Sequence, residues 1–345
     1  MGTRKTEKHN RTTIFSPLFE RKWGVLGTFC IVLLLLFLAI YLVNPEPILK
    51  KIDALAGVSA SPAPAPDALE VYVLDVGQGD CILLRTPGGK AMLVDAGEAI
   101  YAARIKRFLD GFGITRLDAV VAPLLSYLQS QNIGKPKYIF ATHPHADHIG
   151  SMAELISAYE IGTFYLPDTP HTTESYLNML EALERAHVRT KTVYAPGTLN
   201  LGDKDVSIRI LSPFEGVDYN AEGMNNWSIV LRVQYGETSI LLTGDAEAYA
   251  EGVMRANLKD QDLCATVLKL GHHGGSTSST EAFLTAVSPE IAVVSAGAGN
   301  DYGHPHRETL ALLAKYGIPL YRTDESGTIK IMLDGSGVSV ETERE

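Results

Sequence analysis

Cysteine is scarce in this sequence, which has only three among its 345 residues. Cys30 lies within an apolar run, while Cys81 and Cys264 lie in or beside strand-like segments, and no two are closely spaced. Disulfide-rich scaffolds and zinc ribbons both require cysteines that are paired at short spacing. The sequence therefore excludes both classes, and we interpret the three cysteines as small apolar residues.

Two common catalytic motifs are also missing. Because the sequence has neither a Gly-x-Ser-x-Gly elbow nor a P-loop, it gives little support to a serine hydrolase or to a nucleotide-driven enzyme. The segment Gly77-Gln-Gly79 suggests a dinucleotide-binding fingerprint only superficially, since it lacks the third glycine and a helix behind it. The chemistry of this chain must therefore rest on other residue types.

Positive charge is in deficit, and the deficit lies C-terminal to residue 66. The sequence has 30 Lys and Arg against 40 Asp and Glu, and residues 1–66 hold 8 and 4 of these, which leaves 22 and 36 for the rest. Residues 67–345 therefore carry a formal net charge of −14. A domain this acidic does not attract a nucleic acid over its whole surface, so any such contact must use a local basic groove or bound metal ions.

The N-terminal part has a different character. Residues 24–43 form an uncharged apolar run of 20 residues, the length that an α-helix needs to cross a membrane. Basic residues precede the run, so the positive-inside rule predicts that residues 1–23 are cytosolic and that the bulk of the chain is extracytoplasmic. A cleaved signal peptide is the competing interpretation, although its apolar region is usually shorter. A buried core helix is a poorer third option, because no amphipathic pattern breaks the run.

The rest of the chain divides into a linker and one folded domain. Residues 44–68 contain five prolines among alanine and serine, which predicts an extended, semi-rigid spacer. Residues 69–338 show two successive blocks of antiparallel strand patterns, each followed by helix patterns, which predict four layers in the order helix, sheet, sheet, helix. An insert at residues 123–136 looks helical. Residues 317–321 and 328–333 are expected to form a closing hairpin, and residues 341–345 look like a charged tail.

The most informative segment is His143-Pro-His-Ala-Asp-His148, which follows an apolar, strand-like stretch at residues 138–141. Neutral imidazole nitrogens and aspartate oxygens are ligands that zinc and similar divalent metals prefer. The alternative is a solvated loop that happens to be rich in histidine. Three imidazoles and one carboxylate within six residues, directly after a strand, favour a metal site.

Aspartates also follow strand patterns at three further places. In the turns at residues 75–80 and 95–97, an aspartate could orient a ligand histidine through a hydrogen bond, and ordinary turn chemistry explains it equally well. Asp245 ends an apolar strand, where a carboxylate could bridge two cations. The same residue could simply cap the helix that is predicted to follow.

The remaining histidines gather in two loops, each after a predicted strand. His272 and His273 are adjacent and lie among small residues, so one imidazole could reach a metal while the other faces a substrate. His304 and His306 lie in a second loop, after the strand pattern at residues 291–295. Histidine-rich loops are often only loops, but together with the segment at residues 143–148 they indicate one shared site.

Together these segments resemble the metallo-β-lactamase superfamily, whose signature is His-x-His-x-Asp-His. More narrowly, they resemble the metallo-β-lactamase-like domain of ComEC-type competence proteins, which take up DNA. The family's αββα sandwich agrees with the four predicted layers. The matching segments are Leu74-Asp-Val-Gly-Gln-Gly-Asp80, Val94-Asp-Ala-Gly97, Thr142 to Gly150, Asn225 to Leu231, Leu242-Thr-Gly-Asp245, Lys269 to Gly274 and Tyr302-Gly-His-Pro-His306.

The resemblance implies one or two divalent ions, zinc or manganese, that acidify a water for attack on an ester. The implied ligands are His143 and His145 for the first ion, Asp147, His148 and His272 for the second, and Asp245 as the bridge between them. Asp147 counts among the catalytic residues as well, and the resemblance leaves His273 and His304 to bind substrate or to protonate the leaving group. Asn225 and Asn226 lie where many members supply another histidine to the first metal.

The sequence therefore predicts a single-pass membrane protein with an extracytoplasmic, metal-dependent hydrolase domain, most simply a phosphodiesterase or nuclease that acts on DNA or another phosphate ester. One alternative is a cell-wall phosphocholine esterase or a lactonase-type hydrolase. Another is a non-catalytic accessory of DNA uptake that binds DNA or a competence channel protein. One membrane segment cannot form that channel alone.

Overall fold

The computed structural model describes residues 68–111 and 137–344. The predicted membrane segment at residues 24–43, the linker as far as residue 67 and the insert at residues 123–136 lie outside these ranges. Within the described ranges, no helix has the combination of length and apolar character that crossing a membrane requires.

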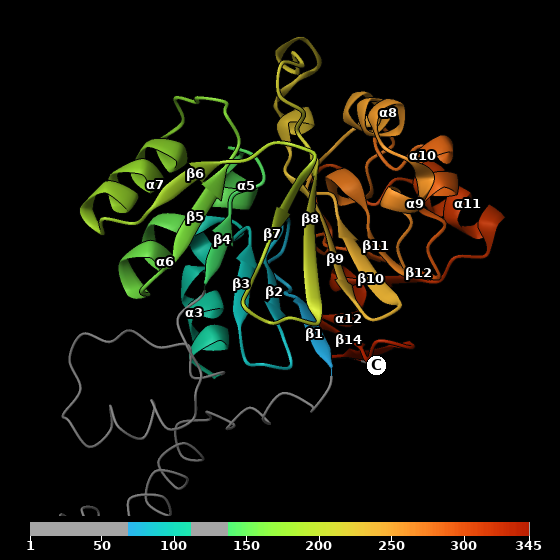
Figure 1. The fold of residues 1–345 in the computed structure, drawn as a ribbon, viewed down its shortest axis with the longest axis horizontal. Coiled ribbons are helices and arrows are strands. Elements are labelled where there is room, and N and C mark those ends of the chain that lie inside the picture. Colours follow the sequence, from blue (N-terminus) through green and yellow to red (C-terminus); the bar gives the residue numbers. More distant parts are fainter. Residues whose placement is uncertain (1–67, 112–136, 345) are drawn as a thin grey trace, which may run out of the picture. The chain divides into compact units, whose positions relative to one another are not determined.

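Two β-sheets form the centre of the fold (Figure 1). The first has eight strands in the order β15-β14-β1-β2-β3-β4-β5-β6, and the second has seven in the order β13-β12-β11-β10-β9-β8-β7. The first sheet contains β1 (Leu69–Val73), β2 (Ile82–Arg85), β3 (Ala91–Val94), β4 (Tyr138–Phe140), β5 (Thr163–Leu166), β6 (Thr190–Thr192), β14 (Ile329–Leu333) and β15 (Val338–Thr342). The second contains β7 (Gly197–Leu199), β8 (Val206–Ser212), β9 (Val230–Tyr235), β10 (Thr238–Leu242), β11 (Val267–Lys269), β12 (Ile291–Val294) and β13 (Leu320–Arg322).

Helices cover the outer face of each sheet, at the left and at the right of Figure 1. Those associated with the first sheet are η1 (Ala99–Tyr101), α3 (Ala102–Gly111), α5 (Ala146–Ile149), α6 (Met152–Ala158) and α7 (Glu174–Arg185). The elements of the second half are η2 (Asn220–Glu222), η3 (Met224–Trp227), α8 (Ala248–Asn257), α9 (Asp260–Leu263), η4 (Gly271–Gly274), α10 (Glu281–Val287), α11 (Arg307–Tyr316) and α12 (Thr323–Ser326).

Three layers of buried apolar side chains hold these elements together. The central layer joins the inner faces of the two sheets, where Val71 and Ile331 of the first sheet belong to one cluster with Leu231 and Ile240 of the second. Two further clusters lie between each sheet and its helices. Because both faces of each sheet are covered, central strands such as β2 and β10 are buried at every position. The predicted stacking of helix, sheet, sheet and helix is thus observed in the described residues.

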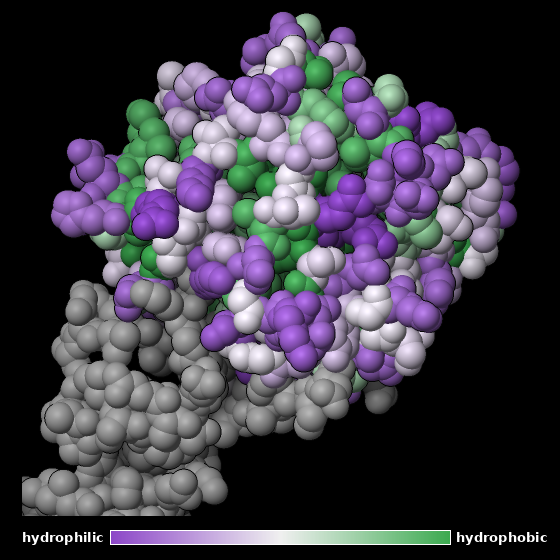
Figure 2. All heavy atoms as spheres, viewed as in Figure 1, coloured by the Kyte–Doolittle hydropathy of each residue, from purple (hydrophilic) through white to green (hydrophobic). Residues whose placement is uncertain are grey.

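The helices follow the apolar stripes of their sequences. In α7, the buried residues Tyr176, Met179, Ala182 and Leu183 recur every three to four positions and face the first sheet. On the face shown in Figure 2, apolar residues are visible in the middle, over the region of β7 and β8, and hydrophilic residues surround them.

The strand directions bring the ends of six strands to one edge of the fold. Strands β3, β4 and β5 pair in parallel within the first sheet, and β10, β11 and β12 pair in parallel within the second. The carboxyl ends of parallel strands lie at the same edge of a sheet, where ligand sites are usually found. All the histidine and aspartate clusters singled out above, except the turn at residues 75–80, directly follow one of these six strands.

The C-terminal region differs from its prediction in two ways. Residues 317–321 and 328–333 do not form a hairpin, because β13 pairs in parallel with β12 in the second sheet while β14 pairs with β1 in the first. The segment at residues 341–345 is not simply a tail, since β15 continues to Thr342 and pairs with β14. Asp334 turns the chain between these strands, because its Oδ1 accepts hydrogen bonds from the backbone amides of Ser336 (2.8 Å) and Gly337 (2.7 Å).

Candidate metal centre

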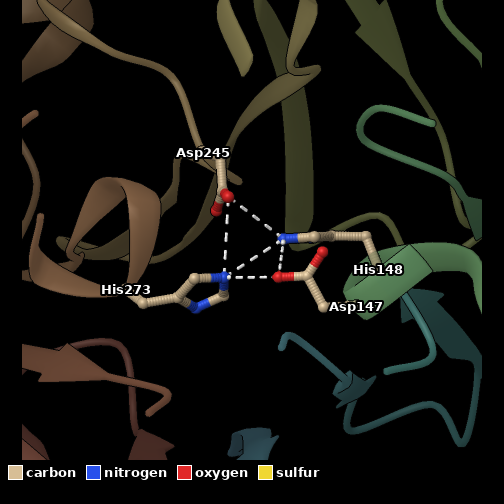
Figure 3. Close-up of side chains that lie close together, drawn as sticks. All are labelled: Asp147, His148, Asp245 and His273. Carbon is tan, nitrogen blue, oxygen red and sulfur yellow. Dashed lines mark hydrogen bonds and ion pairs between the residues drawn. The ribbon is translucent and has the colours of Figure 1, made fainter. Parts of the chain in front are cut away.

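Four side chains from three loops converge on one point (Figure 3). They are Asp147, His148, Asp245 and His273, and their ligand atoms all lie within 4.8 Å of one another. Asp147 and His148 come from α5, Asp245 follows β10, and His273 lies in η4 after β11. Residues distant in the sequence meet here because the carboxyl ends of these strands share one edge.

Asp245 lies at the middle of the group. Its Oδ2 is 3.3 Å from Nε2 of His148, 3.5 Å from Nε2 of His273 and 3.8 Å from Nε2 of His143. Asp245 and all three imidazoles are almost completely buried. A single carboxylate oxygen therefore faces three ring nitrogens, which is the arrangement expected of a ligand shared between two cations.

Two other predicted ligands, Asp147 and His145, adjoin the histidines around Asp245. Asp147 places its Oδ2 3.2 Å from Nε2 of His273 and 3.8 Å from Nε2 of His148. His145 places its Nδ1 3.0 Å from Nε2 of His143, so one nitrogen of each ring lies where both could bind the same cation. Five of the six predicted ligands thus fall into two adjoining groups, one around His143 and His145 and one around Asp147 and His148, with Asp245 against both.

The outer nitrogens of the rings determine which atoms face the centre. His148 donates from Nδ1 to Asp95 Oδ2 at 2.7 Å, and His273 donates from Nδ1 to the Ser295 carbonyl at 3.1 Å. Carboxylate and carbonyl oxygens only accept hydrogen bonds, so both Nδ1 atoms carry a proton, and each Nε2 is the ring atom that faces the centre and is placed to bind a cation. These two Nε2 atoms are 3.3 Å apart and face each other, an arrangement that either a shared proton or a bound cation stabilises.

His143 is oriented in the same way. The hydroxyl of Thr142 donates to Asp95 Oδ2 at 2.6 Å, which leaves its oxygen free to accept from Nδ1 of His143 at 3.1 Å. Nε2 of His143 then points its lone pair at the centre. Asp95 therefore orients two ligand histidines, one directly and one through Thr142, and its backbone takes the left-handed conformation at φ 57° to do so.

A buried oxygen without a partner also fits a metal site. Oδ1 of Asp245 is buried, and among the described residues no group donates a hydrogen bond to it. Leaving a buried carboxylate oxygen unpaired is costly unless a cation supplies the missing interaction. With oriented lone pairs on three imidazoles and two carboxylates beside them, this donor set fits one or two divalent ions.

The charges in the centre favour the same conclusion. Burial by itself raises the pKa of Asp245, but His148 and His273 beside it hold that pKa well below its usual range. Burial by itself lowers the pKa of His148, and the carboxylates of Asp245, Asp95 and Asp147 outweigh it and raise that pKa well above the usual value. Burial lowers the pKa of His143. The carboxylates thus stay ionised and attract positive charge, which a divalent cation can provide in place of a proton.

His272 and His273 exchange the positions expected from the sequence. His272, expected as a ligand, lies outside the four-residue group and is bonded through Nδ1 to Glu247 Oε1 at 2.9 Å. His273, expected to face substrate, contributes its Nε2 to the group. Both residues have left-handed backbones, with φ of 46° and 53°, so the loop turns each ring in a direction that strand and helix periodicity do not predict.

The two asparagines have different surroundings. Asn226 is buried and structural, because its Oδ1 accepts hydrogen bonds from the backbone amides of Glu247 and Ala250 at the start of α8. Asn225 instead faces His272, with Nδ2 3.4 Å from Nε2 of that ring and 3.3 Å from Glu247 Oε1. Its Oδ1 is buried and, within the described ranges, accepts no hydrogen bond. Asn225 thus lies beside His272 and Glu247, outside the four-residue group.

His304 lies one ring away from the centre. Its centroid is 5.1 Å from that of His272 and 6.0 Å from that of His273, and Nδ1 is 3.3 Å from Nε2 of Gln78. Burial, together with the neighbouring His272 and His273, lowers the pKa of His304 to about 4. His304 is therefore a neutral ring at the rim of the centre, where we expect it to contact a substrate.

One buried ion pair behind the centre was not anticipated from the sequence. Lys269 is fully buried at the end of β11 and places its Nζ 2.9 Å from Oδ2 of Asp80. The other oxygen of Asp80 lies 3.7 Å from Nδ1 of His273. The sequence did contain a signal for this pair, namely a lysine within an otherwise apolar strand. A buried ammonium nearly always has an anionic partner, so this lysine could have predicted a buried ion pair.

Comparisons with known proteins agree with this geometry. A family model described as the metallo-beta-lactamase superfamily matches residues 74–298, which include every member of the four-residue group. The chain belongs to the metallo-beta-lactamase superfamily. The predicted membership is thus confirmed.

Two curated relatives illustrate the narrower similarity. The chain is 31% identical over 266 residues to ComE operon protein 3 of Bacillus subtilis, an alignment that covers 76% of this chain and 32% of the relative. It is 32% identical over 295 residues to competence protein ComA of Neisseria gonorrhoeae, covering 83% of this chain and 36% of the relative. The chain therefore spans about a third of the length of these relatives. The similarity to competence proteins of the ComEC type, expected from the motifs, is confirmed.

A solved structure of the same fold family is also similar to the chain. The metallo-beta-lactamase fold protein YhfI from Bacillus subtilis aligns with a TM-score of 0.45 and 11% identity, covering 79% of this chain and 100% of that protein.

The exchange of His272 and His273 can be tested directly. We expect His273→Ala to weaken divalent-metal binding by at least about 100-fold, because groups that only orient a ligand already contribute roughly 10–100-fold. We expect His272→Ala to weaken it by less than about tenfold, because His272 bonds to Glu247 instead. Calorimetric titration of both full-length variants with manganese and with zinc measures the difference. An equal loss in the two variants, or a larger loss for His272→Ala, would contradict the assignment.

Proposed function

We propose that the protein is a metal-dependent hydrolase that cleaves phosphodiesters, with DNA as its substrate. The observation that carries the proposal is the convergence of three imidazole nitrogens and a second carboxylate on Oδ2 of Asp245. Such a centre suits the hydrolysis of an ester, because charge develops there on both the attacking and the leaving oxygen.

The residues for this reaction have separate tasks. His143 and His145 would hold one cation, Asp147, His148 and His273 would hold a second, and Asp245 would contact both. Metal ions bound there would supply an acidified water and an electrophile for a phosphoryl oxygen. Asp95, Thr142 and Ser295 keep the ligand rings in the required tautomers and orientations. His304 remains free to contact the substrate.

The names of two curated relatives support DNA among the phosphodiesters. The name of the Neisseria gonorrhoeae relative refers to competence, and that of a protein of Haemophilus influenzae that is 30% identical over 262 residues refers to recombination. The acidic domain disfavours nonspecific attraction of a polyanion, so recognition must be concentrated at the metal centre and its rim. We further propose that residues 24–43 anchor the protein in the cell membrane, with the hydrolase domain on the outer side.

The proposal is tested by a substrate comparison with the full-length chain. We expect cleavage of linear and plasmid DNA when manganese or zinc is added, and loss of cleavage when a chelator removes the metal. A small aryl phosphodiester and a lactone serve as competing substrates. Cleavage of the aryl phosphodiester without cleavage of DNA would refute the nuclease, and cleavage of the lactone alone would favour the lactonase alternative.

A second candidate is a non-catalytic accessory of DNA uptake, and one observation favours it. Asn225 places its amide beside His272, at a position where the resemblance to the superfamily implies a histidine ligand. A protein of this kind would retain DNA, or a competence channel protein, without cleaving anything. Retention of DNA by the metal-loaded chain, with no product, is the outcome that would select it.

A further inference from the structure

The loop after β12 carries an exposed tyrosine at the rim of the metal centre. Tyr302 is 67% exposed, and its ring stacks on that of His304 with a centroid distance of 5.7 Å and an interplanar angle of 19°. His304 in turn lies 6.0 Å from His273, a member of the four-residue group. Two ring contacts therefore connect the centre to an aromatic surface that is open to solvent.

The loop holds this ring in place. Oδ1 of Asn300 accepts hydrogen bonds from the backbone amides of Tyr302 (3.2 Å) and His304 (3.0 Å), and its Nδ2 donates to the carbonyl of His304 at 2.7 Å. His306 donates from Nε2 to the Tyr302 carbonyl at 3.0 Å. Gln78 braces His304 from the opposite half of the domain. Tyr302 is thus presented on a preorganised support, although its side chain is exposed.

Other exposed tyrosines of the domain have partners that explain them. Tyr316, 43% exposed, donates from its hydroxyl to Glu281, and Tyr249, 36% exposed, donates to the Asp218 carbonyl. The hydroxyl of Tyr302 has no hydrogen-bond partner among the described residues, and the stacking on His304 occupies only one face of its ring. A free aromatic face beside a site for a phosphodiester is the feature that binds a nucleobase by stacking.

We propose that Tyr302 is a stacking platform that holds a nucleobase of the substrate beside the metal centre. The inference rests on the proposed phosphodiesterase function, and it identifies what distinguishes a nucleic acid from a simple phosphodiester at this site. Two successive ring contacts, of 6.0 Å and 5.7 Å, separate His273 from Tyr302, so the base expected on the free face of Tyr302 belongs to a nucleotide that neighbours the phosphate at the centre. Stacking accepts any base, which suits a substrate of arbitrary sequence.

Charge makes such a platform useful in this domain. Residues 67–345 carry a formal charge of −14, so the phosphate backbone gains little from long-range attraction. Stacking does not depend on net charge, and salt screens it far less than it screens phosphate contacts. We therefore expect the contribution of Tyr302 to persist at high salt.

The test compares a short single-stranded oligothymidylate with an abasic oligomer of the same length, using the full-length chain with manganese. For Tyr302→Ala we expect the KM for the oligothymidylate to rise about ten- to a hundredfold, the range that follows loss of one base–aromatic stack. The KM for the abasic oligomer and the kcat for both substrates are expected to change little. Tyr302→Phe should behave like the wild type because it keeps the ring. Tyr316→Ala is the control for loss of an exposed tyrosine.

Equilibrium binding separates this inference from the proposed function. Fluorescence anisotropy with each oligomer measures binding whether or not anything is cleaved. If DNA is not cleaved but Tyr302→Ala loses affinity for the oligothymidylate alone, the nuclease proposal fails and the platform stands. If DNA is cleaved and Tyr302→Ala matches the wild type, or loses both oligomers equally, the platform is overturned and the nuclease proposal stands.

Discussion

The Asp245→Ala variant is expected to lose tight binding of both metal ions and nearly all hydrolytic activity. Oδ2 of Asp245 faces the nitrogens of His143, His148 and His273 at 3.3 to 3.8 Å, so its removal takes a ligand from both halves of the centre. We expect cleavage of DNA to fall at least about 1,000-fold, well beyond the roughly 10–100-fold that follows loss of a group that only orients a ligand. Elemental analysis and a DNA-cleavage assay measure the two losses.

The stability of the same variant distinguishes a lost ligand from a misfolded protein. Without metal, we expect Asp245→Ala to stay folded but to be less stable than the wild type, because the substitution removes the ion pair with His148 while the pair of His148 with Asp95 remains. With saturating manganese, the Tm of the wild type should rise while that of the variant stays unchanged, since a ligand stabilises only the folded state that binds it. Asp205→Ala, which removes an exposed aspartate, is the control. A variant that still gains stability from manganese would refute the bridging role.

Lys269→Met is expected to lower the free energy of unfolding by about 3–5 kcal/mol, because it leaves the carboxylate of Asp80 buried without its counter-charge. The two side chains are 0% and 1% exposed, and the ion pair spans 2.9 Å. Water cannot reach Asp80 to compensate for the loss. Urea unfolding followed by circular dichroism measures the effect.

Two further variants show whether the loss of stability in Lys269→Met comes from breaking the ion pair or from changing the size of the side chain. The double variant Lys269→Met with Asp80→Asn removes both charges, and we expect it to regain most of the lost stability, because replacing both partners of a buried pair is far less costly than removing one. Lys330→Met is the matched control. Its ammonium lies 3.5 Å from Glu70 and 3.3 Å from Glu341 and is partly solvated, so we expect a change of less than about 1 kcal/mol. A double variant as unstable as Lys269→Met would contradict the explanation.

Much of the fold was predictable because its periodic patterns are local. The apolar stripe of α7 and the apolar runs of β2 and β10 indicate buried elements whatever their neighbours are. Strand partners were less predictable. The segments at residues 317–321 and 328–333 look like a hairpin in sequence, yet their strands belong to different sheets, because β13 extends the parallel set of β10 to β12. Pairing between distant strands depends on which edge strand of a sheet still lacks a neighbour, and a local sequence pattern does not contain that information.

Some candidate ligands could likewise be assigned from local sequence, and others could not. His143, His145, Asp147 and His148 lie within six residues and follow one strand, so their proximity is evident from the sequence. Asp245 could be assigned from its place at the end of a strand. The choice between His272 and His273 could not be made, because both lie in a loop whose left-handed backbone sets the direction of each ring.

The sequence by itself determined the kind of chemistry, since histidines and aspartates at the ends of apolar strands indicate a metal site in any arrangement of those strands. Only the tertiary structure decided which atoms meet. The orientation of His273 by Ser295, the pairing of Lys269 with Asp80, and the contact of Gln78 with His304 join residues that are distant in the sequence. Such contacts depend on the direction in which each side chain leaves its backbone, and the packing of the two sheets sets that direction.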